Sequence, residues 1–176
     1  KEALEKYKIG YISEDRKKEG LILMHNVLDN TGITVWSQLK KFFNFLDDST
    51  IGKKVVPYIE KLEVKTPSNY QLISNLSGGN QQKISVAKWL SAGTDILFID
   101  EPTVGIDVKT KGYLHELIID LAKSGTTIVL ISSDMPEMIS LADRIIVMKN
   151  FIIKGEINND HNYQSMSSSI MEFIHD

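Results

Sequence analysis

Two short stretches of the chain combine residue types and spacings that suit chemistry on a phosphate compound. Residues 76–83 read LSGGNQQK, so a serine and two glycines stand directly before a run that can continue as a helix. Ser77 predicts a helix N-cap, because its hydroxyl can accept a hydrogen bond from a first-turn N–H group. Gly78 and Gly79 let the backbone approach a ligand closely, and the helix that begins there presents unpaired N–H groups and a positive dipole end. Such an end attracts phosphate, although a serine and glycines alone also begin ordinary capped helices.

Residues 95–103 read DILFIDEPT and predict a strand that ends in two carboxylates. The apolar run 96–99 is typical of a strand buried on both faces of a parallel sheet. Asp100 and Glu101 follow at its carboxyl end, where open α/β sheets bind their ligands. An Asp at this position (Walker B) helps to hold the Mg²⁺ of a bound nucleotide, and a neighbouring carboxylate can orient or deprotonate an attacking water. A strand ending in Asp-Glu is common by chance, whereas the ordered pair of stretches is a specific signal.

The order of these stretches resembles the ATP-binding cassette (ABC) family, in which a signature motif and its helix precede Walker B and a D-loop. Residues 76–83 resemble the signature motif, with Asn80 where many members carry Gln, and residues 104–107 (VGID) resemble the D-loop. The resemblance implies ATP and Mg²⁺ as ligands. It places Ser77 and Gly79 against the γ-phosphate of ATP held by the opposite cassette of a closed dimer, with Gly78 and Asn80 in the same site. It also places Asp107 at the dimer interface, and this residue is independently a good N-cap for a helix over Val108–Lys123.

Two positions depart from the family's usual residues. In cassette order Glu14 occupies the Q-loop position, where a glutamine usually contacts the Mg²⁺ and the attacking water and couples the nucleotide to the membrane partner. On charge alone, residues 14–20 predict a solvated loop. Ser133 follows the strand predicted over residues 126–131, at the place where most cassettes carry a histidine that senses the γ-phosphate. A serine can donate a hydrogen bond there, but it cannot titrate near neutrality.

The stretches GYISEDRKKEGL and ISSDMPEM resemble the second cassette of tandem-cassette importers for simple sugars such as ribose, galactose or xylose. The resemblance implies an asymmetric role. The signature residues would complete the ATP site built mainly by the first cassette. Asp100, as metal ligand, and the catalytic candidates Glu101 and Ser133 would serve the other site, which Glu14 and Ser133 predict to be impaired. Lys83, one turn into the signature helix, could equally assist a phosphate or face solvent.

Length and composition limit the alternatives. The chain has 176 residues, enough for one domain with a sizeable core. Its formal net charge is −3 with acids and bases interspersed, which argues against nucleic acid as the main partner. It has no cysteine, which excludes disulfides and thiolate metal sites. No segment approaches the ~20 consecutive apolar residues of a membrane span, so any membrane association goes through a partner.

We expect an α/β fold: a partial P-loop NTPase core with a mostly parallel sheet, plus a helical subdomain. Residues 1–176 are interpreted as a single nucleotide-binding domain fragment, with residues 8–13 and 95–156 in the α/β core and about 21–90 in the helical subdomain. The core is expected to include a buried strand over residues 126–131 and a closing hairpin over residues 144–156, before a short C-terminal helix.

Apolar spacings of three and four residues predict helices over residues 31–43 and 52–64 in the helical subdomain. Pro57 would mark a first turn or a kink in the second helix. The resemblance places this subdomain against the transporter's membrane subunits, and Trp36, Phe42 and Phe43 could supply that contact. Core packing is the commoner role for such aromatics.

The sequence does not contain G-x-x-x-x-G-K-[ST], the loop whose amides cradle nucleotide phosphates. We therefore interpret the chain as the C-terminal part of a cassette, inactive as an ATPase by itself. The parent would couple ATP hydrolysis to uptake of a monosaccharide at the cytoplasmic face of a bacterial membrane. Its partners would be the other cassette, the transmembrane permease subunits and, indirectly, a periplasmic or lipid-anchored sugar-binding protein, with no nucleic acid.

Three alternatives stay open at this stage. The same tandem architecture also carries nucleosides, and an ATPase half does not read the cargo. A soluble ABC ATPase acting on DNA or ribosomes would be expected to show basic patches or long coiled-coil insertions, and this chain shows neither. The fragment could also serve only as a dimerisation and regulatory module.

Overall fold

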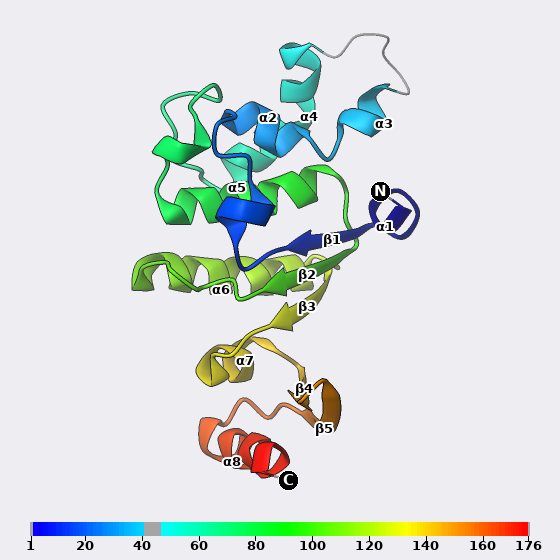
Figure 1. Ribbon diagram of the computed structural model, residues 1–176, viewed down its shortest axis with the longest axis vertical. Coiled ribbons are helices and arrows are strands. Elements are labelled where there is room, and N and C mark those ends of the chain that lie inside the picture. Colours follow the sequence, from blue (N-terminus) through cyan, green and yellow to red (C-terminus); the bar gives the residue numbers. More distant parts are fainter. Residues whose placement is uncertain (1, 41–46, 176) are drawn as a thin grey trace. The chain divides into compact units, whose positions relative to one another are not determined.

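The computed structural model describes residues 2–40 and 47–175, which fall into two compact units, Lys1–Val129 and Leu130–Asp176. Figure 1 shows the elements of both units along the chain. No helix in the described part of the chain is both long enough and apolar enough to cross a bilayer.

A parallel sheet carries the predicted strands of the α/β core. Its three strands are β1 (Ile9–Ile12), β2 (Ile96–Asp100) and β3 (Thr127–Ile131), in the order β1-β2-β3. β1 pairs in parallel with β2 so that Ile12 lies opposite Ile99. The carboxyl ends of these two strands therefore meet at one edge of the sheet, and their parallel pairing agrees with the predicted mostly parallel sheet.

The prediction that residues 126–131 form a buried strand was wrong, because no residue of β3 is buried. Thr127, Val129 and Ile131 are exposed, Val129 to 37% and Ile131 to 47%. Among the described residues β3 has one neighbouring strand, and alternate side chains of a strand point to opposite faces of the sheet. A β-branched apolar run has the same composition whether one face is covered or both, so the sequence could not distinguish these cases.

Helix α5 (Gly78–Ser91) is the most enclosed helix of the first unit. Figure 1 shows it between the sheet and the helices α2 (Val27–Gly32) and α4 (Asp48–Lys61), and it contacts β1, α2 and α4. Its apolar residues are largely buried, and so are several of its polar residues. The buried members of both kinds are Gln81, Gln82, Ile84, Ser85, Val86, Ala87, Lys88, Leu90 and Ser91.

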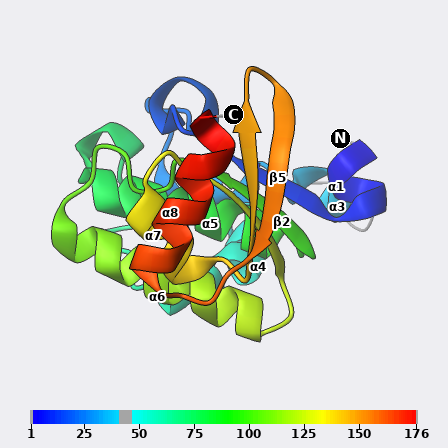
Figure 2. The same cartoon turned by 90° about the horizontal axis from the view of Figure 1, so that it is seen from below.

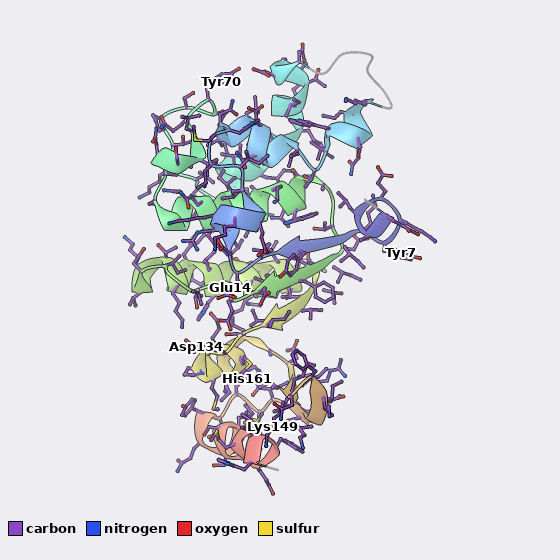
Figure 3. All side chains as sticks on the ribbon, in the orientation of Figure 1. Tyr7, Glu14, Tyr70, Asp134, Lys149 and His161 are labelled. Carbon is purple, nitrogen blue, oxygen red and sulfur yellow. The ribbon has the colours of Figure 1, made fainter. Side chains whose placement is uncertain are left out.

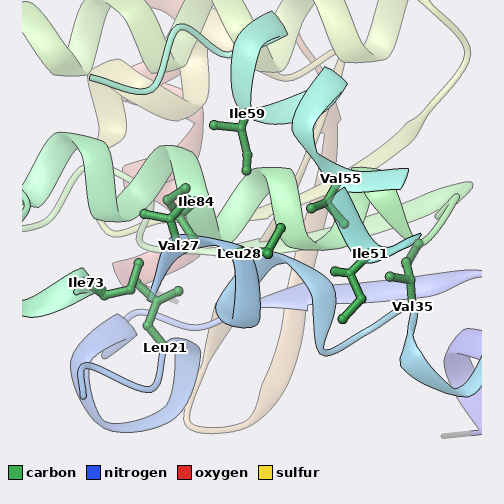
Figure 4. Packing of buried hydrophobic residues seen from close by; sticks show 10 residues of the cluster. Leu21, Val27, Leu28, Val35, Ile51, Val55, Ile59, Ile73 and Ile84 are labelled. Atoms are coloured by element: carbon green, nitrogen blue, oxygen red, sulfur yellow. The ribbon is translucent and has the colours of Figure 1, made fainter. Parts of the chain in front are cut away.

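An apolar core joins α2, α4 and α5 within the first unit. Figure 4 shows branched aliphatic side chains from these helices and from the intervening turns converging on one another. Trp36 packs against this core, as the commoner role for an aromatic predicts. The core consists of Leu21, Val27, Leu28, Val35, Ile51, Val55, Ile59, Ile73, Ile84 and Ala92.

The helices of this region differ in detail from the predicted ones. The helix predicted over residues 31–43 is instead two short helices, because α2 ends at Gly32 and α3 spans Trp36–Lys40. Phe42 and Phe43 lie outside the described residues. α4 begins at Asp48, capped by Asp47, so Pro57 lies in its interior and not in its first turn. The spacing of apolar residues did not reveal the break between α2 and α3, because the buried Val35 between them keeps the apolar pattern continuous.

The charged run after β1 also differs from the predicted solvated loop. Residues Arg16–Gly20 form a single π-type helical turn that begins after Asp15, whose side chain accepts a hydrogen bond from Lys18 N. Arg16 is buried, with 9% of its surface exposed, while Lys17, Lys18 and Glu19 are exposed.

The second unit contains α7 (Met135–Leu141), the strands β4 (Arg144–Lys149) and β5 (Ile152–Asn158), and α8 (Tyr163–His175). β4 and β5 are antiparallel, which confirms the predicted hairpin, and Asn150 and Phe151 form its turn with positive φ values of 53° and 62°. Positive φ at both central residues is typical of a type I′ turn. Figure 2 shows α8 lying along the hairpin, and its buried residues Met166 and Ile170 pack with apolar residues of α7 and β4.

Candidate functional site

The carboxyl end of β2 holds the two predicted carboxylates. Asp100 is the last residue of the strand and Glu101 follows it, and both are half-buried. Tyr11, on the neighbouring strand β1, donates its phenolic proton to Asp100 Oδ2 over 2.7 Å. This hydrogen bond to a carboxylate raises the pKa of Tyr11, with smaller contributions from burial and from the charge of Asp100. Tyr11 therefore fixes the orientation of the Asp100 carboxylate at the strand end.

The backbone of Glu101 has an uncommon conformation. Its φ is 44°, in the left-handed region, and the chain turns there through the buried Pro102 to Gly105, whose φ is 69°. Val104 N donates to Glu101 O over 3.3 Å inside this turn. A non-glycine residue in this region costs on the order of 1–3 kcal/mol, and such residues cluster at functional sites. The strain makes Glu101 a stronger candidate for a functional role than its position at a strand end alone.

Ser77 is the N-cap of α5, as predicted. Its Oγ accepts a hydrogen bond from Asn80 N at 3.4 Å and another from Asn80 Nδ2 at 3.0 Å. Asn80 Oδ1 in turn accepts a hydrogen bond from Lys65 N at 2.8 Å. Asn80 therefore joins the start of α5 to the turn that follows α4.

The two glycines after Ser77 lie close to side chains of neighbouring segments. A Cβ atom on Gly78 would lie 2.9 Å from Arg16 Nη2, and one on Gly79 would lie 2.7 Å from Thr110 Cγ2. Thr110 is in the first turn of α6 (Val108–Lys123), and its hydroxyl donates to Asp107 Oδ2 over 2.7 Å. The signature residues thus lie against both the turn after β1 and the start of α6.

Asp107 caps α6, as predicted. Its Oδ1 accepts a hydrogen bond from Thr110 N at 3.0 Å. The hydrogen bonds from Thr110 lower the pKa of this carboxyl group, so Asp107 is ionised at neutral pH. The expected position of Asp107 at a dimer interface is untested and stays a prediction.

Arg16 joins the turn after β1 to the D-loop segment, residues 104–107. Its Nη1 donates to Val104 O over 3.3 Å, while its Nε is buried and makes no hydrogen bond to any described residue. Glu14, exposed beside it, lines a hollow of about 320 Å³ together with Arg16, Val104 and Gly105. Figure 3 labels Glu14 on the segment that leaves β1. This role of Arg16 could not be predicted from the sequence, because a cation within a charged run is usually solvated.

The Lys83 ammonium group is neither simply solvated nor directed at a phosphate site, because it contacts a backbone carbonyl and an aromatic ring. Its Nζ donates to Glu63 O over 3.1 Å and lies 3.8 Å from the centroid of the Tyr113 ring. Tyr113 OH donates to Leu62 O over 2.9 Å. Burial lowers the pKa of Lys83 and raises that of Tyr113. The two side chains therefore cap the carbonyl groups at the end of α4, a role that neither alternative from the sequence included.

Ser133 belongs to the second unit, between β3 and α7. The surrounding loop is shaped by its neighbours: Ser132 Oγ donates to the buried Glu137 carboxylate over 2.7 Å, and Asp134 Oδ1 accepts from Glu137 N over 2.9 Å. Figure 3 labels Asp134 in this unit. Ser133 itself is exposed. Its predicted role beside a nucleotide stays a prediction, as do the roles of the other candidate residues.

Comparison with known families identifies the chain. The model of the ABC transporter family matches residues 2–104. This match covers more than half of the chain and includes the signature residues and both carboxylates at the end of β2.

Curated bacterial proteins match most of the chain. It is 47% identical over 164 residues to the ribose import ATP-binding protein RbsA of Clostridium perfringens, covering 93% of this chain and 32% of that protein. It is 42% identical to the galactose/methyl galactoside import ATP-binding protein MglA 1 of Photobacterium profundum, covering 86% and 31%. For the xylose import ATP-binding protein XylG of Thermoanaerobacter pseudethanolicus the identity is 40%, with 86% and 30% covered. The chain thus spans about a third of the length of these relatives.

Solved structures confirm the α/β fold with its parallel sheet and helices. The ATP-binding cassette MJ0796, solved as a dimer bound to ADP and phosphate, superposes with a TM-score of 0.69 at 23% identity, covering 85% of this chain and 62% of that one. CbiO1 of Clostridium perfringens superposes with a TM-score of 0.72 at 19% identity, covering 93% and 61%. The chain belongs to the ABC transporter family.

Proposed function

We propose that this chain is part of the ATP-hydrolysing subunit of an importer for a simple sugar. The observation that carries the proposal is its identity of 40–47% to proteins that import ribose, galactose or xylose, over 86–93% of its length. The geometry supports the ATPase part of the proposal. Within one compact unit, the signature residues lie against the D-loop segment, which directly follows the carboxylates of β2.

The residues present fit a nucleotide. The Ser77 hydroxyl and the first-turn amides of α5 are donors suited to phosphoryl oxygens, and Gly78 and Gly79 in this turn are half-buried. Bound ATP would supply the phosphoryl group that is transferred to water. Ser77 would bind its terminal phosphate in trans, Gly78, Gly79 and Asn80 would shape the same site, and Asp107 would hold the dimer interface.

The carboxyl end of β2 fits a magnesium ion bound mainly through phosphate. Among the described residues no three His, Asp or Glu side chains cluster as a metal site. Mg²⁺ is usually held by one or two carboxylates plus phosphate oxygens and water, so the oriented carboxylate of Asp100 suffices as its protein ligand. Glu101 would orient or accept a proton from the attacking water, with Glu14 at the edge of the same site. The role predicted for Ser133 beside a nucleotide is a separate proposal.

The relatives' names also indicate partners and location. A protein that imports sugar needs a pore, so we infer transmembrane permease subunits, another cassette that completes the dimer, and a sugar-binding protein outside the membrane. Nucleic acid is not among the inferred partners. The chain would lie at the cytoplasmic face of a bacterial membrane, attached through the permease. A nucleoside is the alternative cargo.

Three variants of the full-length gene product, reconstituted with its permease, test this proposal. If the signature segment completes the productive site and the carboxylates serve an impaired one, Ser77→Ala lowers ATP turnover on the order of 100-fold and Glu101→Gln lowers it less than threefold. Exposed Lys54→Met is the control. Equal losses of ATP turnover for the first two variants would contradict the asymmetry. If vesicles take up a nucleoside but no monosaccharide, the proposed cargo is wrong and the nucleoside takes its place. A wild-type protein without ATP turnover would refute the ATPase role itself.

A further inference from the structure

Asn80 makes a directed pair of hydrogen bonds inside the signature segment. Its side-chain oxygen accepts from the backbone N–H of Lys65 at 2.8 Å, and its side-chain nitrogen donates to Ser77 Oγ at 3.0 Å. A backbone N–H can only donate, so the oxygen of the Asn80 amide must face Lys65 and the NH₂ group must face Ser77. The turn that follows α4 therefore fixes which end of the Asn80 amide points at the serine.

This orientation determines the direction of the Ser77 hydroxyl proton. A serine hydroxyl has one proton to donate and two lone pairs to accept with. Both lone pairs of Ser77 Oγ are engaged, one by Asn80 Nδ2 at 3.0 Å and the other by Asn80 N at 3.4 Å. The proton cannot point toward either donor, so it points away from Asn80. Ser77 itself is exposed, and its O–H therefore points outward from the start of α5.

We propose that Asn80 is a positioning residue that presents Ser77 to a phosphate as a hydrogen-bond donor. A phosphate oxygen is an acceptor, so a hydroxyl whose lone pairs faced outward would repel it, whereas one whose proton faces outward binds it. Asn80 acts through Ser77 and does not need to touch the ligand. This inference rests on the proposed function, because it names how the same site recognises the terminal phosphate of ATP.

An isosteric change separates this role from simple packing. In Asn80→Asp, one carboxylate oxygen still accepts from Lys65 N, so the link to the turn after α4 is kept. The other oxygen can only accept, so Ser77 must donate its proton inward and turn a lone pair toward the ligand. The variant therefore keeps the shape and reverses the direction of a single hydrogen bond.

The added negative charge needs its own control. Asn75 is exposed and lies two positions before Ser77. Asn75→Asp places the same charge near the start of α5 without any hydrogen bond to the serine recorded in the structure. A second control is Asn80→Asp in a Ser77→Ala background, where the charge is present but no hydroxyl remains to be turned.

The experiment measures kcat/KM for ATP and the Kd for ADP of the full-length gene product. We expect Asn80→Asp to lower kcat/KM roughly 10- to 100-fold, the loss typical of a hydrogen bond to a charged group. Asn75→Asp should change kcat/KM less than about threefold. In the Ser77→Ala background, Asn80→Asp should lower kcat/KM less than about threefold further. The Kd for ADP should not change, because ADP lacks the terminal phosphate, and a purely structural role would not distinguish the two nucleotides.

Two results would overturn the inference while leaving the proposed function intact, both with an active wild type. In the first, Asn80→Asp has the same kcat/KM for ATP as the wild type. In the second, Asn80→Asp lowers kcat/KM as much in the Ser77→Ala background as it does alone. A wild type that does not hydrolyse ATP would instead remove the proposed function and this inference with it. A thermal midpoint for Asn80→Asp within a few degrees of the wild type shows that the variant folds.

Discussion

Lys88 gives a prediction whose sign and size follow from its burial. It lies in α5 with 8% of its surface exposed, its Nζ donates to Gly20 O, and its ammonium lies 5.2 Å from the centroid of the Trp89 ring. Burial lowers its pKa from 10.5 to about 8. The folded protein therefore holds this proton less tightly than the unfolded chain does.

The lowered pKa makes stability rise with pH over one defined window. Below about pH 8 both states carry the proton, and the folded state bears the full cost of burying the charge. Between about pH 8 and 10.5 the folded state has released the proton while the unfolded state keeps it, so the free energy of unfolding increases. Up to pH 9.5 this window spans about 1.5 pH units, which at about 1.4 kcal/mol per unit gives a gain of about 2 kcal/mol.

The assay compares wild type with Lys88→Met, which keeps the apolar stem and removes the titrating group. Both proteins are unfolded in urea at pH 7 and pH 9.5. Subtracting the change in the variant from the change in the wild type cancels the contributions of all other titrating residues, because the two proteins share them. Between these pH values, the free energy of unfolding of the wild type should rise by about 2 kcal/mol more than that of the variant. For a chain of this size this corresponds to roughly 4–8 °C in thermal midpoint. Lys54→Met, which removes an exposed lysine of α4, should run parallel to the wild type.

Parallel profiles for wild type and Lys88→Met would refute the reasoning, because they would mean that Lys88 titrates alike in the folded and unfolded states. A gain for the variant at high pH would also refute it. The difference in free energy of unfolding between wild type and Lys88→Met at pH 7 alone does not test the reasoning. There the variant is relieved of a buried charge but loses the hydrogen bond to Gly20 O, and the two effects oppose each other.

Two further substitutions test the contacts around the signature helix. Gly79→Ala places a Cβ atom 2.7 Å from the branched side chain of Thr110, so we expect a loss of about 1–3 kcal/mol in the free energy of unfolding. Gly112→Ala, in the same helix as Thr110 with no atom within 4 Å of the new Cβ, should instead be neutral or stabilise by up to about 1 kcal/mol, and equal effects would contradict the close approach. Tyr113→Phe removes the hydrogen bond to Leu62 O while keeping the ring, and should cost about 1 kcal/mol in urea unfolding; an unchanged midpoint would show that water replaces the phenol.

The capped starts of α5 and α6 were the part of this fold that the sequence predicted best, and the reason is that they are local. Ser77 and Asp107 cap their helices through hydrogen bonds to residues three positions along the chain. Such contacts depend on residue type and short spacing, both of which can be read directly. The strand β2 was also predictable, because an apolar run that ends in carboxylates indicates the ligand-binding edge of a sheet.

Contacts between distant segments were the part that could not be predicted. Lys83 offered the same pattern whether it met a phosphate or solvent, and its actual partners lie at the end of α4 and in α6. Asn80 was expected at a ligand because of its motif, while the structure uses its side chain between Ser77 and the turn at Lys65. No periodicity in the sequence distinguishes these partners, because each depends on where another helix ends.

Arg16 and Lys88 were missed for a common physical reason, and it bears on Glu14. Both are buried cations that donate to backbone carbonyl groups far away in sequence, Arg16 to Val104 O and Lys88 to Gly20 O. Burying a cation is unfavourable unless an acceptor is fixed in place, so each contact requires that both segments are already folded. The turn Arg16–Gly20 is thereby held at one end by the D-loop segment and at the other by the signature helix. Glu14 O accepts a hydrogen bond from Arg16 N over 3.0 Å at the start of this turn, so the two contacts also restrain the backbone that carries the Glu14 carboxylate.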